Sequence, residues 1–285
     1  MPQLLSSACL LAASFVLFTP FNIYMVDRLI SASYTTAIAP PHPRNATPPS
    51  RICVLVPVTS RKNEDWARLE DSALHGALLP SLKNTYEPER FLYSVYVGYD
   101  LGDAFYDNRT TLRAMRQWAA THLPFALVVA VPVSNPLQRP GPVMNLLSRA
   151  AYNDSCDFMY QVKDTTECLT PWSSAFVDAL RTMSPPLRGV VGPVCEYGNT
   201  AILTHDFVHR GHLDLFPTHY PAELTDWWAD DWITAVYAPR NALRLADVVV
   251  ARRPMPVMRY SVNWGGSERL RGLIEQGRGV LNVSV

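Results

Sequence analysis

The sequence of 285 residues predicts an α/β fold in which a central, mostly parallel sheet lies between two layers of helices. Short apolar runs rich in β-branched residues alternate along the chain with segments whose apolar residues recur at helical spacing. Polar turns follow the apolar runs, as expected where buried parallel strands end. Apolar residues make up 48% of the sequence and charged residues 18%, so the chain can form one large core and is not disordered as a whole.

The first expected strand covers residues 51–57 (RICVLVP), an apolar run that ends at a proline and a polar turn. Further strands are expected at 91–99, 125–133 and 158–162. Helices are expected at 65–82, 108–122, 143–152 and 232–237. Because ligands bind beyond the carboxyl ends of parallel strands, the polar turns after these strands are expected to form the functional site.

Residues 4–26 are almost continuously apolar, and a helix of this length crosses the hydrocarbon core of a bilayer. A cleaved signal peptide is the alternative, because the most apolar part ends near Phe18. Residues 27–50 contain a proline-rich stretch that cannot pack as a domain and that predicts an extended stem. The expected organisation is a cytosolic tail (1–3), a signal-anchor (4–26), the stem (27–50) and one folded domain (51–285).

Asn-x-Ser/Thr sequons follow the apolar segment, at Asn45, Asn108, Asn153 and Asn282. A short tail, one apolar span, a proline-rich stem and a domain with sequons together describe a single-pass type II protein. We therefore expect the chain in the Golgi or endoplasmic reticulum membrane, with its domain in the lumen.

The charge and cysteine content argue against two classes of function. Basic and acidic side chains number 25 each, whereas a nucleic-acid-binding protein usually carries a basic excess. None of the five cysteines forms a CxxC pair, so a zinc site is not expected. Cys9 lies in the apolar leader and Cys53 in an expected core strand. The other three cysteines leave open one disulfide or none: Cys156, Cys168 and Cys195.

An acidic turn, from Asp164 to Glu167, follows the expected strand at 158–162. Two carboxylates at the end of a central strand can hold Mg²⁺ or Mn²⁺ through oxygen ligands while a diphosphate supplies further oxygens. A solvated turn that caps the following helix is the alternative interpretation.

Longer strings of residues resemble one family. They are DFMYQVKDTTECLTPW at 157–172, VVGP at 190–193, ILTHDFVHR at 202–210 and WWADDW at 227–232. These strings resemble GT-A glycosyltransferases, and more closely a protist and large-virus group of nucleotide-diphospho-sugar transferase type. The resemblance covers about residues 52–260. It implies a GT-A Rossmann-like three-layer sandwich and hexosyltransferase-like transfer of a sugar from a nucleotide-diphosphate-sugar to a hydroxyl of a lumenal glycan or glycoprotein.

The resemblance also implies roles for single residues. Asp164 and Glu167 would hold the divalent metal, Mn²⁺ or Mg²⁺. The base and ribose pocket would be lined by Thr59, Arg61 and Asp100. Two departures make the acidic turn less negative than in the family, because Lys163 stands where glycine is usual and Thr165 where aspartate is expected.

Two more nucleotide contacts are expected from the residues themselves. Asn145 lies in the string GPVMN at a helix start, where exposed backbone N–H groups favour anions. Arg139, in the preceding loop, can bind a phosphate through two parallel hydrogen bonds.

The segment 225–232 (TDWWADDW) combines three tryptophans with three aspartates. By the resemblance, Asp231, or else Asp230, is the base that removes the proton of the acceptor hydroxyl. Inversion at the anomeric centre is expected, because no nucleophile is apparent. Sugar and acceptor contacts are expected from Trp227, Trp228, Trp232 and His209. The alternative is that an aspartate caps a helix, the tryptophans fill the core and His209 is structural.

Two other functions remain open. The altered acidic turn is compatible with a catalytically weakened protein of the same fold that binds a nucleotide or a glycan. A lumenal interaction protein whose tryptophans are core residues is the third interpretation. The basic residues near the C-terminus, Arg259 among them, either return over the diphosphate or form a solvated loop.

Overall fold

The strand β1 (Arg51–Val58) lies between two parallel neighbours and is apolar on both faces. Ile52 and Val54 belong to the hydrophobic cluster on one side of the sheet, and Cys53 and Leu55 to the cluster on the other. Burial on both faces is typical of a parallel strand that helices cover from each side. The computed structural model describes residues 49–254, 259–260 and 262–283.

The sheet has 8 strands in the order β3-β2-β1-β4-β7-β6-β8-β5. The parallel half consists of β3 (Ala126–Val133), β2 (Leu92–Asp100), β1 and β4 (Phe158–Gln161). The other half consists of β7 (Phe207–His209), β6 (Val190–Cys195), β8 (Ala242–Arg252) and β5 (Thr166–Cys168). Here β7 is antiparallel to both β4 and β6, β8 is parallel to β6, and β5 is antiparallel to β8.

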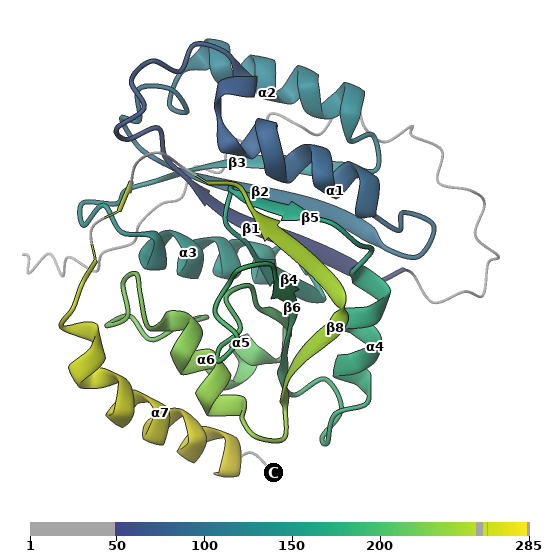
Figure 1. Cartoon of the computed structure of the whole chain (residues 1–285), viewed down its shortest axis with the longest axis vertical. Helices are drawn as coiled ribbons and strands as arrows, with labels where there is room; N and C mark the ends of the chain where they lie inside the picture. The colour runs from purple at the N-terminus through teal and green to yellow at the C-terminus, as the bar shows by residue number, and fades with distance from the viewer. Residues whose placement is uncertain (1–48, 255–258, 261, 284–285) are drawn as a thin grey trace, which may run out of the picture.

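Helices cover both faces of the sheet (Figure 1). One face carries α1 (Leu79–Thr85), α2 (Arg109–His122) and α4 (Ser173–Arg181). The other face carries α3 (Pro140–Asn153), α5 (His212–Leu215) and α6 (Ala229–Tyr237). The last helix, α7 (Gly266–Val283), packs against α6. This three-layer arrangement with a mixed, mostly parallel sheet confirms the predicted fold class.

The single helix expected at 65–82 was wrong in detail. The structure has a 3₁₀ turn, η1 (Leu69–Asp71), then a π-helical turn, η2 (Leu74–Leu78), and then α1. Ser72 is extended and bonds its hydroxyl to the carbonyl of Leu69, which competes with a continuous helix. Pro80 has no N–H for the carbonyl of Gly76, and that carbonyl accepts a hydrogen bond from Arg253 instead. The strands β5 and β8 and the helix α7 were not predicted.

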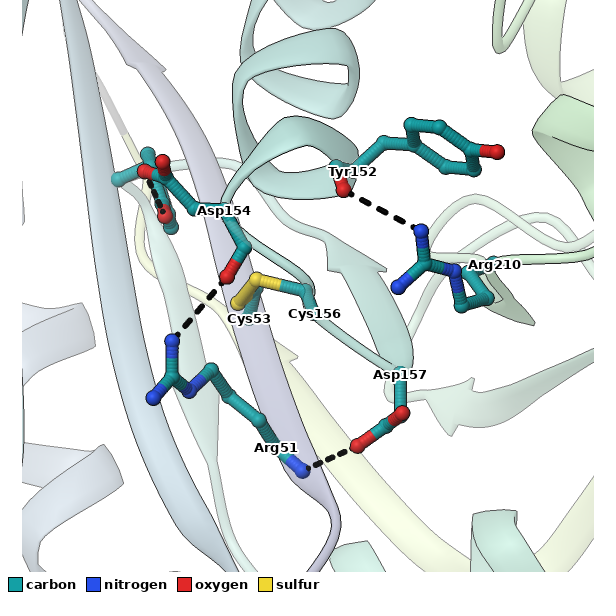
Figure 2. Close-up of a disulfide and its surroundings, with 8 residues drawn as sticks. Arg51, Cys53, Tyr152, Asp154, Cys156, Asp157 and Arg210 are labelled. Atoms are coloured by element: carbon teal, nitrogen blue, oxygen red, sulfur yellow. Dashed lines mark hydrogen bonds between the residues drawn. A yellow bond between two sulfur atoms is a disulfide. The ribbon is translucent and has the colours of Figure 1, made fainter.

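A disulfide joins Cys53 of β1 to Cys156, which precedes β4 (Figure 2). The two Cα atoms are 6.0 Å apart, and the sequence separation is 103 residues. The expectation that any bridge would form among the last three cysteines was therefore wrong, because Cys168 and Cys195 are free. Side-by-side pairing of β1 with β4 brings the two bonded cysteines together.

The same end of β1 is held by polar contacts. The backbone N–H of Arg51 donates to Asp157 at 2.8 Å, and its guanidinium donates to the carbonyl of Asp154 at 3.1 Å (Figure 2). These contacts lie at the amino ends of β1 and β4, opposite the edge where ligands bind in such sheets.

None of the helices in the described ranges is both long and apolar enough to span a bilayer. The predicted tail and signal-anchor, the stem up to residue 48 and the sequon at Asn45 lie outside these ranges. The proposed domain organisation therefore stays a prediction.

Candidate functional site

A cavity of about 360 Å³ opens at the carboxyl ends of β1, β2 and β3. Its lining includes Thr59, Arg61 and Asp100, the three residues expected to form the base and ribose pocket. Trp66 and Asn135 also line it. The strand ends thus gather the predicted nucleotide residues in one place, as the parallel topology requires.

Asp100 is the polar centre of this cavity. One carboxylate oxygen accepts a hydrogen bond from Arg61 at 2.7 Å, and the other accepts one from the Asn135 amide at 2.8 Å. Burial raises the pKa of Asp100, although Asn135 and Arg61 oppose the shift. Asn135 was missed because it lies in the loop after β3, where the sequence shows no motif.

Asp103 fixes the loop after β1 against the loop after β2. Its carboxylate accepts hydrogen bonds from the Ser60 backbone N–H at 2.7 Å, the Ser60 hydroxyl at 2.7 Å and the Thr59 hydroxyl at 3.0 Å. Burial would raise the pKa of Asp103, but hydrogen bonds from Tyr106 and Ser60 outweigh it and hold the pKa below its usual value. Thr59 therefore contributes to the cavity through loop geometry as well as through its own atoms.

Aromatic rings form another wall of the cavity. Trp66 and Phe105 both line it and meet edge to face, with ring centroids 5.6 Å apart. Trp66 is half-buried, so part of its ring is open to a ligand. Aromatic faces of this kind provide stacking surfaces for planar groups such as bases.

Asp164, at the end of β4, forms a buried ion pair with Arg259. Both carboxylate oxygens accept hydrogen bonds from the guanidinium, each at 2.6 Å, and the side chains are 3% and 9% exposed. Arg259 also donates to the carbonyl of Thr59 at 2.9 Å. Arg259 is therefore buried and bonded to two loops that follow parallel strands, and it does not belong to a solvated loop. Its expected position over a diphosphate stays a prediction.

The described residues do not fit the predicted divalent metal. Asp164 has both oxygens occupied by Arg259, and Glu167 is exposed on β5, between the buried residues Thr166 and Cys168. The hydroxyl of Thr166 pairs with a nitrogen of His205 at 2.8 Å. Over the described ranges, no three His, Cys, Asp or Glu side chains gather as metal ligands would.

The first turn of α6 carries the two candidate bases. The Lys163 ammonium, beside Asp164 in the chain, lies 3.8 Å from a carboxylate oxygen of Asp230. Burial raises the pKa of Asp230, and the carboxylates of Asp206 and Asp231 add to this, whereas Lys163 opposes it. The α6 start and the β4 turn thus face one another.

Asp231, one residue later, is half-buried, and burial raises its pKa. In the described part of the chain, its carboxylate makes no hydrogen bond or ion pair with another residue. The two adjacent aspartates therefore differ: Asp230 forms an ion pair with Lys163, whereas the carboxylate of Asp231 has no such partner among the described residues.

The tryptophans of the motif have different environments. Trp232 is buried and donates its indole N–H to the carbonyl of Leu273 in α7, so it is a core residue and not a sugar contact. Trp228 is largely packed at the start of α6 with a left-handed backbone. Trp227 is 50% exposed and meets Trp264 edge to face at 5.6 Å. Trp264, 65% exposed, was missed because it lies far from the motif in sequence.

Arg139 and Asn145 have protein partners. Arg139 forms an ion pair with Asp226, which also accepts a hydrogen bond from the Asn263 N–H at 2.6 Å. The Asn145 amide donates to the carbonyl of Tyr220 at 3.0 Å and accepts from its N–H at 2.8 Å. Asn145 thus clamps a loop to α3, which does not favour the expected nucleotide contact.

His209, expected to contact the sugar or the acceptor, is the last residue of β7. It pairs with Phe158 at the amino end of β4, whereas the acidic turn follows the carboxyl end. His209 therefore lies at the amino end of β4, whereas Asp164 follows the carboxyl end, so His209 is not part of the candidate site.

No protein-family model matches the sequence, and no curated protein matches it. Among solved structures, the fold is similar to S. aureus TarS 1–349 in complex with UDP, with a TM-score of 0.53, 16% identity, and coverage of 80% of this chain and 65% of that one. A second structure of S. aureus TarS 1–349 has a TM-score of 0.52 and 14% identity, with coverage of 80% of this chain and 65% of that one. A structure of S. aureus TarS has a TM-score of 0.51 and 14% identity, with coverage of 79% of this chain and 39% of that one. The chain thus spans about two thirds or less of these structures. At these identities the similarity shows a shared fold alone.

Proposed function

We propose that the domain transfers a sugar from a nucleotide-diphosphate-sugar to a hydroxyl of a glycan or glycoprotein. The observation that carries this proposal is a continuous line of contacts. It runs from the cavity residue Thr59 through Arg259 to Asp164, and Lys163 next to it reaches Asp230 of α6. The donor and the acceptor would meet along this line. The UDP in the TarS complex makes a uridine nucleotide the first donor to test.

The proposed base is Asp231. It would take the proton of the acceptor hydroxyl as that oxygen attacks the anomeric carbon, while the bond from this carbon to the phosphate oxygen breaks and its electrons leave with the nucleoside diphosphate. Asp231 suits the task because its carboxylate is unengaged within the described ranges and its pKa is raised by burial. Direct attack by the acceptor gives inversion.

Asp230 would be a positioning residue. Its contact with Lys163 is an ion pair at 3.8 Å, which keeps the ammonium near the turn that follows β4. On the acceptor side, the exposed ring of Trp227 offers a surface on which a sugar can stack.

The lumenal location remains part of the proposal. The disulfide supports it, because disulfides persist in oxidising compartments. The sequon residues Asn108, Asn153 and Asn282 are all exposed, as glycosylation requires. We infer attachment to the Golgi or endoplasmic reticulum membrane from the sequence of residues 4–26 alone.

The test is sugar transfer or donor hydrolysis by the purified protein over a panel of uridine and guanosine diphosphate sugars. Asp231→Asn is expected to lower kcat by about 10²- to 10⁴-fold, the usual contribution of a general base, while UDP affinity stays the same. Asp178→Asn is the matched control, because this aspartate of α4 is 58% exposed. Equal activity of Asp231→Asn and the wild type would exclude Asp231 as the base.

Binding without transfer is the second candidate, favoured by the pairing of Asp164 with Arg259. A ligand at one hundred times its Kd stabilises a fold by about 2.7 kcal/mol, so a thermal-shift panel detects binding independently of turnover. Stabilisation by UDP with no transfer of any sugar would support this candidate. No stabilisation by any nucleotide would favour an interaction protein.

A further inference from the structure

Four aspartates at or near the candidate site each form an ion pair with a basic side chain. The pairs are Asp100 with Arg61 at 2.7 Å, Asp164 with Arg259 at 2.6 Å, Asp230 with Lys163 at 3.8 Å, and Asp226 with Arg139. Each pair is locally neutral. A site that recruits Mg²⁺ or Mn²⁺ needs carboxylates with free oxygens, whereas both oxygens of Asp100 and both oxygens of Asp164 already accept hydrogen bonds.

The pairing is tightest at the position where the metal was expected. A cation could reach the Asp164 oxygens only by displacing Arg259, whose guanidinium is 9% exposed and would lose its counter-charge. The carboxylate of Glu167 is exposed on β5, and Asp231 alone is one carboxylate. Among the described residues, Asp164 thus belongs to no group of three or more His, Cys, Asp or Glu side chains that could hold a metal ion.

The same side chains carry the positive charge that a diphosphate needs. The Lys163 side chain is 44% exposed, and its only ion-pair partner in the described ranges is 3.8 Å away, so its remaining N–H groups can donate to phosphate. Arg259 uses three of its five N–H groups on Asp164 and Thr59. Arg61 lies at the cavity, 24% exposed.

We propose that this protein binds the diphosphate of its donor without a divalent cation, and that Lys163 and Arg259, with Arg61, supply the positive charge. The proposal rests on the proposed function and names the chemistry of its donor site. When the bond between the anomeric carbon and the phosphate oxygen breaks, the electron pair stays on that oxygen. The fixed cations stabilise the resulting charge, and the proton from the acceptor goes to Asp231.

The experiment is calorimetric titration of the purified protein with UDP in EDTA, in Mg²⁺ and in Mn²⁺. The Kd is expected to agree within about twofold in the three buffers, because no binding energy comes from a metal. A Kd at least about tenfold weaker in EDTA than in Mn²⁺ would overturn this inference and leave the proposed function standing. Absence of UDP binding in every buffer would overturn both.

Two variants test the cations. Lys163→Met is expected to raise the Kd for UDP about tenfold or more, since a charge-assisted hydrogen bond to phosphate is lost. The Kd for uridine, which lacks phosphate, is expected to stay within about twofold. Lys83→Met is the control, because this lysine is exposed on α1. Arg259→Lys keeps the positive charge beside Asp164 and is expected to fold. It is expected to bind UDP more weakly, because lysine cannot donate the two parallel hydrogen bonds of a guanidinium. Wild-type UDP affinity in both site variants would contradict the assignment.

Discussion

Replacing Arg259 by methionine would leave a buried carboxylate without its counter-charge. Asp164 accepts two charge-assisted hydrogen bonds of 2.6 Å from this guanidinium, and its side chain is 3% exposed. Removing one partner of a buried ion pair costs about 3–5 kcal/mol, whereas removing both is often close to neutral. We therefore expect Arg259→Met to cost about 3–5 kcal/mol and the double variant with Asp164→Asn to cost at least about 2 kcal/mol less.

The measurement is the free energy of unfolding in urea for the wild type, the two single variants and the double variant. Arg181→Met is the matched control, because its partner Asp178 is 58% exposed and such surface pairs contribute about 0–1 kcal/mol. A loss below about 1 kcal/mol in Arg259→Met, equal to that of the control, would refute the reasoning, since it would mean that water reaches the Asp164 carboxylate.

Three other predictions follow from contacts outside this pair. Replacing both Cys53 and Cys156 by serine should lower the free energy of unfolding by about 4–5 kcal/mol, because the disulfide closes a loop of about 100 residues in the unfolded chain. Peptide mapping without reductant that shows two free thiols would contradict the disulfide. Gly141→Ala should cost about 1–3 kcal/mol in thermal melting, because a Cβ would lie 2.6 Å from the carbonyl oxygen of Thr225, and an unchanged Tm would exclude that contact. Burial, helped by nearby cations, lowers the pKa of His205 to about 3, so below about pH 6.5 the unfolded state binds a proton that the native state refuses. As the pH is lowered from about 6.5 to 3, this histidine alone should therefore reduce the free energy of unfolding by about 1.4 kcal/mol per pH unit. The measurement is urea unfolding at pH 7 and at pH 5, and the loss between them should be smaller in His205→Asn than in the wild type.

Local patterns in the sequence predicted the parallel half of the sheet. The continuous apolar run in 51–57 and the helical spacing in 108–122 are properties of short segments, so they can be recognised without the rest of the chain. The strand-end rule brought together the turns after the first strands, because it depends only on strand direction. Thr59, Arg61 and Asp100, which the resemblance had assigned to one pocket, do line one cavity.

Contacts between distant residues could not be predicted in this way. Arg259 follows Asp164 by 95 residues, and Trp264 follows Trp227 by 37, so neither pairing leaves a pattern in a short window. The antiparallel pairing of β7 with β4 also could not be predicted. Because of this direction, His209 lies beside the amino end of β4 and away from the cavity. Tertiary packing decided these positions, whereas local propensity decided the strands.

The disulfide in Figure 2 joins β1 to the residues just before β4, near the amino ends of both strands. This covalent link keeps β1 and β4 in fixed alignment, so neither strand can slide past the other. Near their carboxyl ends, Arg259 donates hydrogen bonds to the carbonyl of Thr59, which follows β1, and to the carboxylate of Asp164, which follows β4. The two strands are therefore linked at both ends, by a covalent bond at one and by a buried ion pair at the other.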